Sequence, residues 1–186
     1  GIAKAVNELQ GYDVFKAMPR FILPQPERCA PMAQAWEKAK ANNFPDGWLH
    51  DYPVWENPVT SIPTLSTGNP KAYPTLAPLV KDSKGEITSS QETKAVDVAR
   101  LVAYQTQSKI GPAAALTVVG FFESLRKQEI RHGDVVMLNI GEGTARSPEF
   151  MAQLAYTTQN ITKLDEVVKR RKEAFYDKIW QAVAEI

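Results

Sequence analysis

The stretch from Gly111 to Pro148 decides the fold that the sequence predicts, and it reads GPAAALTVVGFFESLRKQEIRHGDVVMLNIGEGTARSP. Its first part is continuously apolar and opens with a proline, which suits the first turn of a helix, so we expect a buried helix over 112–128. The apolar run over 135–139 indicates a buried strand. A long helix followed by a buried strand is typical of α/β proteins.

A glycine-punctuated loop follows this expected strand, with Gly141 and Gly143 on either side of Glu142. In open α/β sheets, ligands bind where such loops leave the carboxyl ends of the strands. Glycine lets the backbone approach a flat or anionic ligand without a Cβ in the way. Taken alone, the G-E-G pattern fits a tight structural turn equally well.

Size and composition indicate one sizeable hydrophobic core and no long-range electric field. The chain has 186 residues, of which 44% are hydrophobic, and a formal net charge of +1, which disfavours nucleic acid and acidic membranes as partners. The single cysteine, Cys29, excludes an internal disulfide framework and suits a reducing compartment. No apolar segment approaches the roughly 18 residues that cross a bilayer. We therefore expect a cytoplasmic protein.

Helical and strand-like patterns alternate along the chain, which predicts a doubly wound, mostly parallel sheet. Residues 42–64, rich in proline and tryptophan, interrupt the alternation and are expected to form an irregular excursion that its aromatic side chains pack down. The other expected elements are helices over 2–10, 30–42, 71–81, 89–107 and 162–186, and strands over 20–23 and 86–88.

Two local signals set boundaries in this scheme. Pro24 and Pro26 are expected to end the strand over 20–23, because proline cannot donate to a ladder. Ser89 and Glu92 have the S-x-x-E spacing of a capping box, which predicts that they open the next helix. In that helix Ala95, Val98, Ala99 and Val102 are expected to face inward.

The positions of the histidines and the cysteine in the sequence do not indicate a metal site or a nucleophilic thiol. His50 and His132 have no Cys, His or carboxylate at metal-ligand spacing, so we expect no metal site. Cys29 fits a buried, inert thiol. The chain starts at Gly1 directly on a helical pattern with no capping residue before it, from which we expect a fragment whose upstream part is missing.

Several segments occur in a particular order and spacing: GIA at 1–3, LSTGNP at 65–70, SSQET at 89–93, SKIGPAAA at 108–115 and VVMLNIGEG at 135–143. This set resembles the C-terminal half of the threonine synthase and cysteate synthase family, which are pyridoxal-phosphate enzymes of the tryptophan-synthase-β type (fold type II). The resemblance covers roughly residues 1–148. It implies a three-layer, doubly wound, mostly parallel sheet with pyridoxal phosphate as the cofactor.

Within the family, Leu138-Asn139-Ile140 and Gly111-Pro112 lean toward cysteate synthase. The resemblance then implies a lyase or transferase of amino-acid metabolism, which replaces the phosphate of O-phosphoserine with sulfite to give cysteate for coenzyme M synthesis. The alternative inside the family is threonine synthase, which acts on O-phosphohomoserine. The alternative outside enzyme chemistry is a degenerate, non-catalytic domain that binds a ligand or a partner.

The resemblance also implies a set of site residues. Cofactor contacts are expected from Gly1, Gly68, Asn139, Gly141 and Glu142. Loop position predicts that the anionic groups of a phospho-amino acid substrate lie near Thr67, Asn69 and Arg146.

The sequence departs from the family at two points. The Schiff-base lysine of the family lies in the N-terminal half, and no lysine here matches its motif, so the chain alone is expected to be inactive. Opposite the pyridine nitrogen, where the family places a hydroxyl or thiol, this sequence offers Ile140 or Gly141. Asn139, Glu142 and Thr144 are the other candidates, and a carboxylate there would keep that nitrogen protonated.

The resemblance implies two domains and several partners. Residues 1–148 would form the cofactor-binding α/β domain, including the excursion over 42–64, and residues 149–186 a C-terminal helical extension. The expected partners are the missing N-terminal half, the phospho-amino acid substrate and a second copy in a homodimer, without nucleic acid or membrane.

Overall fold

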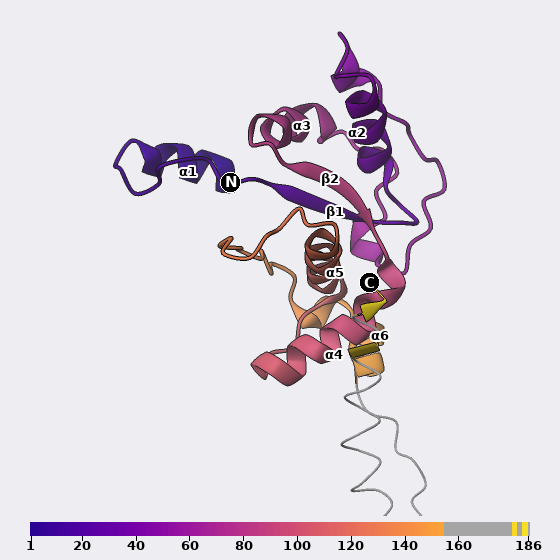
Figure 1. Ribbon diagram of the computed structural model, residues 1–186. Helices are drawn as coiled ribbons and strands as arrows, with labels where there is room; N and C mark the ends of the chain where they lie inside the picture. The colour runs from indigo at the N-terminus through magenta and orange to yellow at the C-terminus, as the bar shows by residue number, and fades with distance from the viewer. Residues whose placement is uncertain (155–179, 182–183, 186) are drawn as a thin grey trace, which may run out of the picture. The chain divides into compact units, whose positions relative to one another are not determined.

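The computed structural model describes residues 1–154 together with residues 180, 181, 184 and 185 (Figure 1). Its contacts divide the chain into two compact units. Unit 1 comprises Gly1–Val59 and Ser66–Ser89, and unit 2 comprises Thr60–Leu65 and Ser90–Ile186. The protein is mixed α/β, as the sequence predicted.

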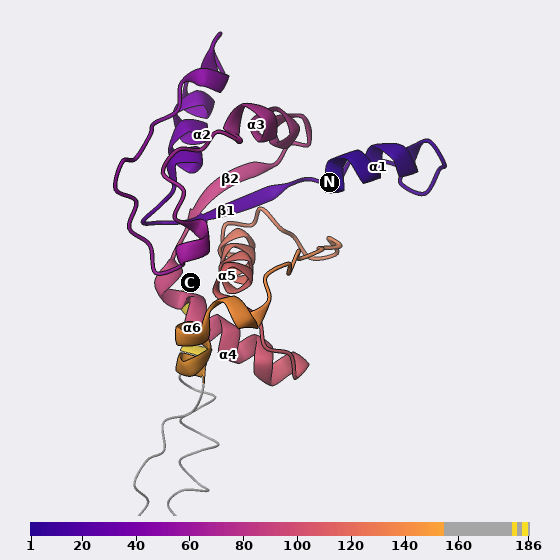
Figure 2. The same cartoon turned by 180° about the vertical axis from the view of Figure 1, so that it is seen from behind.

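Unit 1 contains a pair of parallel strands, β1 (Ile22–Pro26) and β2 (Glu86–Ser90), except that Ser90, the last residue of β2, belongs to unit 2. The strands lie side by side in both views of the molecule (Figures 1 and 2). The N–H of Glu86 donates to the C=O of Phe21 at 2.9 Å and sets their register. Within the described part of the chain, the sheet consists of these two strands.

The expectation that Pro24 and Pro26 end the first strand is wrong, because both prolines lie inside β1. Successive residues of a strand direct their backbone polar groups to opposite sides. Since the C=O of Phe21 faces β2, the odd-numbered residues of β1 carry the ladder. The two prolines then fall on the side away from β2, where a missing N–H breaks no bond.

Three helices belong to unit 1: α1 (Ile2–Gln10), α2 (Pro31–Ala41) and α3 (Tyr73–Asp82). In both views α2 and α3 lie on the same side of the strand pair (Figures 1 and 2). The N-terminus of α2 is capped from a distance, since the Gln25 Oε1 accepts from the N–H of Ala33 at 3.0 Å. The core of the unit is formed by Ala30, Ala33, Ala35, Trp36, Tyr73, Ala77, Val80 and Ile87.

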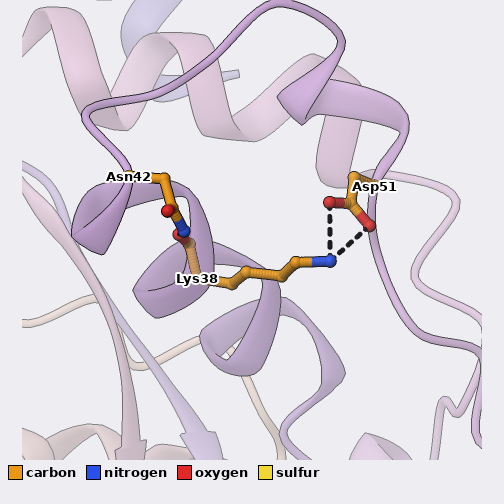
Figure 3. Close-up of polar contacts among 3 residues, drawn as sticks. All are labelled: Lys38, Asn42 and Asp51. Carbon is orange, nitrogen blue, oxygen red and sulfur yellow. Dashed lines mark hydrogen bonds and ion pairs between the residues drawn. The ribbon is translucent and has the colours of Figure 1, made fainter.

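The segment over 42–64 is irregular apart from two short 3₁₀ turns, Trp48–His50 and Pro63–Leu65, and it is divided between the two units at Val59 and Thr60. In unit 1 its aromatic rings pack down as expected, because Trp48 lies edge-on to Trp36 at a centroid distance of 6.2 Å. A surface ion pair adds to this fastening. Lys38 Nζ on α2 lies 2.9 and 2.7 Å from the two carboxylate oxygens of Asp51 (Figure 3).

Unit 2 is helical in its described part. The 3₁₀ turn Glu92–Lys94 leads into α4 (Ala95–Thr106), which packs against both α5 (Pro112–Arg126) and α6 (Pro148–Leu154). The buried helix expected from Pro112 onward is therefore confirmed. The core of the unit consists of Ala95, Val98, Ala99, Ile110, Ala114, Ala115, Val118, Val119, Phe150 and Leu154, and Val102 packs against it.

The strand expected over 135–139 is wrong for this structure, since these residues form no strand. Val135 is fully exposed and Met137 is 72% exposed, while Leu138 packs against the core of unit 2. An apolar run can supply strand propensity, but a strand also needs a partner for its backbone N–H and C=O groups. No strand pairs with this run among the described residues.

The capping box expected at Ser89 and Glu92 is also wrong. β2 continues through Ser89 to Ser90, and Glu92 is 3% exposed inside a 3₁₀ turn. Its carboxylate accepts from Thr60 Oγ1 at 2.5 Å and from the N–H of Ser61 at 2.9 Å. These bonds tie residues 60 and 61 to unit 2.

The helix expected over 162–186 lies outside the described residues apart from four positions near its end. Of these four, Glu185 binds Lys94 Nζ at 2.8 Å, and the hydrogen bond and charge of Lys94 lower the pKa of the Glu185 carboxyl. Among the helices that the structure describes, none has the length and apolar character that crossing a membrane requires.

Candidate functional site

The candidate cofactor loop of unit 2 runs from Asn139 to the 3₁₀ turn Thr144–Arg146. Asn139, Gly141 and Arg146 are exposed, while Glu142 and Thr144 are half-buried. A Cβ built on Gly141 or Gly143 would meet nothing within 4 Å, and neither glycine has a positive φ. Among the described residues, therefore, no atom fills the space next to the Cα atoms of these two glycines.

Glu142 is the point at which this loop is fastened. Its Oε2 accepts from the backbone N–H of Ala113 at 2.6 Å, and its Oε1 accepts from Thr64 Oγ1 at 3.0 Å. Ala113 is in the first turn of α5, where N–H groups have no partner within the helix. The helix dipole adds to the attraction for a carboxylate. Glu142 thus does for α5 what an N-cap side chain does, although it lies 29 residues further along the chain.

The second candidate segment, Leu65–Pro70, is a turn whose central residues belong to unit 1. Thr67 and Asn69 are exposed, and Gly68 is buried. The C=O of Gly68 accepts from the N–H of Trp55 at 2.9 Å, and a Cβ on Gly68 would lie 1.9 Å from the C=O oxygen of Trp55. Within the chain itself, then, a close backbone approach requires this glycine.

The structure brings the predicted residues together in two sets. Unit 1 holds Thr67, Gly68 and Asn69 on one turn, and unit 2 holds Asn139, Gly141, Glu142 and Arg146 on one loop. Gly1 is exposed at the start of α1, where its C=O accepts from the N–H of Ala5 at 3.1 Å.

Sequence reasoning missed the buried carboxylate of Glu123, on α5. This side chain is 9% exposed and accepts from Ser90 Oγ at 2.6 Å and from the N–H of Gln91 at 3.0 Å. A signal for it was present, because an acidic residue inside the apolar run GFFESL needs partners if the run is buried. The same reasoning applies to Glu92.

Tyr73 carries the clearest electrostatic perturbation of unit 1. Its side chain is fully buried in the aromatic cluster, with its ring centroid 6.0 Å from that of Trp48 and 5.7 Å from that of Tyr52. Burial, and then the negative charge of Asp51, raise the pKa of Tyr73 to about 12. Its hydroxyl makes no hydrogen bond among the described residues.

The remaining candidates are two histidines and the cysteine. His50 and His132 are exposed, and Cys29 is fully buried. Over residues 1–154 and the four described positions near the C-terminus, no three His, Cys, Asp or Glu side chains gather as a metal site would require.

The chain matches no model of a known protein family, and no curated protein is significantly similar to it in sequence.

Proposed function

We propose that this chain supplies the C-terminal half of a pyridoxal-phosphate enzyme of fold type II. The reaction that we propose is the replacement of the phosphate of O-phosphoserine by sulfite, which gives cysteate and phosphate. The support comes from the sequence segments LSTGNP, GPAAA and VVMLNIGEG, which occur in the order and spacing of the threonine synthase and cysteate synthase family.

The single observation that carries the proposal is the hydrogen bond between Glu142 and the N–H of Ala113. It joins the glycine-punctuated loop to the first turn of the GPAAA helix, and these are two of the segments on which the resemblance depends. Both belong to unit 2. A chance resemblance of short motifs would not require the two segments to meet in space.

The residues of this loop fit one side of a cofactor site. Gly141 and Gly143 leave room for a flat ring, and the exposed amide of Asn139 and the half-buried hydroxyl of Thr144 are available as hydrogen-bond partners. The chain does not provide the lysine that matches the family's motif, so a complete site needs a lysine from another polypeptide segment. When bound, the cofactor supplies the electron sink, and the protein supplies orientation and anion contacts.

Arg146 is the residue that we assign to the phosphate of the substrate in unit 2. It is exposed, it belongs to the same loop as Asn139, and its guanidinium can bind a phosphate through two hydrogen bonds. In unit 1, the exposed hydroxyl of Thr67 and the exposed amide of Asn69 remain proposed substrate contacts.

The proposal extends to the fold, which we infer to be the three-layer, doubly wound sheet of fold type II. Support comes from the parallel pair of β1 and β2, since parallel strands are typical of α/β proteins whose sheets are covered by helices. The proposal places further strands beside β1 and β2, contributed by the N-terminal half.

The test is a substrate comparison with the chain combined with a polypeptide that provides the N-terminal half and its lysine, loaded with pyridoxal phosphate. We expect phosphate release from O-phosphoserine and formation of cysteate when sulfite is added. Release of phosphate from O-phosphohomoserine with formation of threonine would instead favour threonine synthase. If neither substrate releases phosphate from a cofactor-loaded protein, the proposed reaction is wrong.

Substitution of Arg146 separates the substrate contact from general damage. Arg146→Ala removes the proposed phosphate partner, so KM for the phosphorylated substrate should rise roughly 10- to 100-fold with a smaller change in kcat. Arg146→Lys keeps the charge but loses the paired hydrogen bonds, and we expect its KM to lie between those of the wild type and Arg146→Ala. An unchanged KM in Arg146→Ala contradicts the assignment.

A further inference from the structure

The glycine at position 111 has no conformational reason to be a glycine. Its φ of −77° and ψ of 172° are extended backbone that any residue adopts. The reason is space: a Cβ at this position would lie 2.6 Å from Glu142 Oε2 and 3.0 Å from both Cδ and Cγ of Glu142. Real Cβ atoms do not approach other atoms to 2.6 Å, so a side chain at 111 and the observed place of Glu142 exclude each other.

Three segments that are far apart in the sequence meet at this carboxylate. Thr64 lies 78 residues before Glu142, and Ala113 lies 29 residues before it. Both carboxylate oxygens are engaged, one by the Thr64 hydroxyl and one by the Ala113 N–H. A carboxylate that accepts a backbone N–H at a helix N-terminus makes a short, charge-assisted bond, and its charge is favoured there.

We propose that Glu142 is the positioning residue of the cofactor loop, and that Gly111 is its seat, meaning that the absence of a side chain at 111 leaves the space in which the Glu142 carboxylate lies. We also propose that Glu142 does not itself contact the cofactor ring, and this second statement rests on the proposed function. Glu142 holds its neighbours Asn139 and Thr144 in place, and one of these two neutral side chains faces the pyridine nitrogen. A neutral amide or hydroxyl does not hold that nitrogen protonated as a facing carboxylate would.

The anchor is tested without any cofactor, by hydrogen exchange at the backbone N–H of Ala113. Glu142→Ala should speed this exchange by about 10- to 100-fold, because a hydrogen bond to a charged group is lost. Gly111→Ala should have a similar effect, since its methyl group displaces the carboxylate. Gly143→Ala is the matched control: it adds the same methyl group beside Glu142 in the loop, meets nothing within 4 Å, and should leave the exchange unchanged.

A double mutant distinguishes displacement of Glu142 by the methyl group at position 111 from a general effect of that methyl group on α5. If Gly111→Ala acts only by displacing Glu142, it should have little further effect in a Glu142→Ala background. An Ala113 N–H that stays protected in Glu142→Ala would overturn the anchor, whether or not the protein binds pyridoxal phosphate. Fully additive effects, or an Ala113 N–H that stays protected in Gly111→Ala, would overturn the role of Gly111.

The positioning role is tested on the cofactor-loaded protein by the ¹⁵N NMR spectrum of labelled pyridoxal phosphate, in which the shift of the pyridine nitrogen reports the protonation of the ring. Glu142→Gln retains an oxygen that can accept from the Ala113 N–H, so it should keep the spectrum and the affinity for pyridoxal phosphate. Gly111→Ala and Glu142→Ala should weaken that affinity in parallel. A shifted spectrum in Glu142→Gln, with Gly111→Ala unaffected, would instead place the carboxylate on the ring. A wild-type protein that binds no cofactor would defeat the proposed function and leave the exchange test standing.

Discussion

Ser90 Oγ donates a 2.6 Å hydrogen bond to Glu123 Oε2, and the other oxygen of the same carboxylate accepts from the N–H of Gln91 at 3.0 Å. Ser90 is 1% exposed and Glu123 is 9% exposed. A carboxylate on an apolar helix thus fastens Ser90 and Gln91 to the C-terminal part of α5. Buried polar groups that depend on one another in this way are costly to separate.

Glu123→Ala should lower the free energy of unfolding by roughly 2–4 kcal/mol, because it leaves the Ser90 hydroxyl and the Gln91 N–H buried without a partner. Glu123→Gln can satisfy only one of the two donors and should cost less. Urea unfolding followed by circular dichroism measures both variants. A loss below about 1 kcal/mol for Glu123→Ala would show that water replaces the carboxylate.

The surface ion pair between Lys38 and Asp51 should contribute far less than the buried contact. Their side chains are 61% and 60% exposed, and exposed pairs typically contribute about 0–1 kcal/mol. A double-mutant cycle with Lys38→Met and Asp51→Asn measures the coupling. We expect it to weaken as salt is added, whereas a coupling that survives 1 M salt (a Debye length of about 3 Å) would indicate a pair that is shielded from solvent.

The raised pKa of Tyr73 predicts that the protein loses stability at alkaline pH. Its pKa is about 12 in the folded protein and 10.0 for an ordinary tyrosine. Since the folded pKa is raised, the protein gains stability from this group below pH 10 and loses it as the pH rises from 10 toward 12. The loss should reach roughly 1 kcal/mol by pH 11.

Tyr73→Phe is the matched variant for this test. It removes a hydroxyl that has no hydrogen-bond partner among the described residues, so its stability at pH 8 should equal or exceed that of the wild type. Unfolding in urea at pH 8 and pH 11 gives the difference between the two proteins. Equal pH dependence in both would contradict the raised pKa of Tyr73.

Gly68→Ala should destabilise unit 1 by about 1–3 kcal/mol, because its Cβ would lie 1.9 Å from the Trp55 oxygen and the turn must shift. Gly1→Ala serves as the control, since nothing lies within 4 Å of the corresponding Cβ. Thermal unfolding of the two variants compares them. A Gly68→Ala protein of full stability that fails to bind pyridoxal phosphate would assign this glycine to the cofactor rather than to the turn.

The helices α1, α2, α3 and α5 could be predicted from the sequence because their signals are local. Pro112 followed by a long apolar run defines α5, and Ala35 and Trp36 mark the buried side of α2. The errors arose where the deciding partner is distant. Glu92 has the spacing of a cap for its own helix, but its carboxylate binds Thr60 and Ser61, 32 and 31 residues earlier.

The same distinction applies to the strands and to the candidate site. The run over 135–139 has the composition of a strand, yet pairing depends on a neighbouring strand that composition does not specify. Pro24 and Pro26 lie within β1 because only one side of that strand carries the ladder. The role that we propose for Glu142 depends on Ala113 and Thr64, which no local motif connects to it.

The central claim is tested most directly by trapping pyridoxal phosphate. The chain would be combined with a polypeptide that supplies the N-terminal half, given pyridoxal phosphate, reduced with borohydride and mapped by mass spectrometry. The account predicts visible absorption of lysine-bound cofactor in the combined protein and none in this chain without the N-terminal half. The trapped lysine should lie outside this chain. No trapped lysine in the combined protein, or one of the lysines of this chain carrying the cofactor, would contradict it.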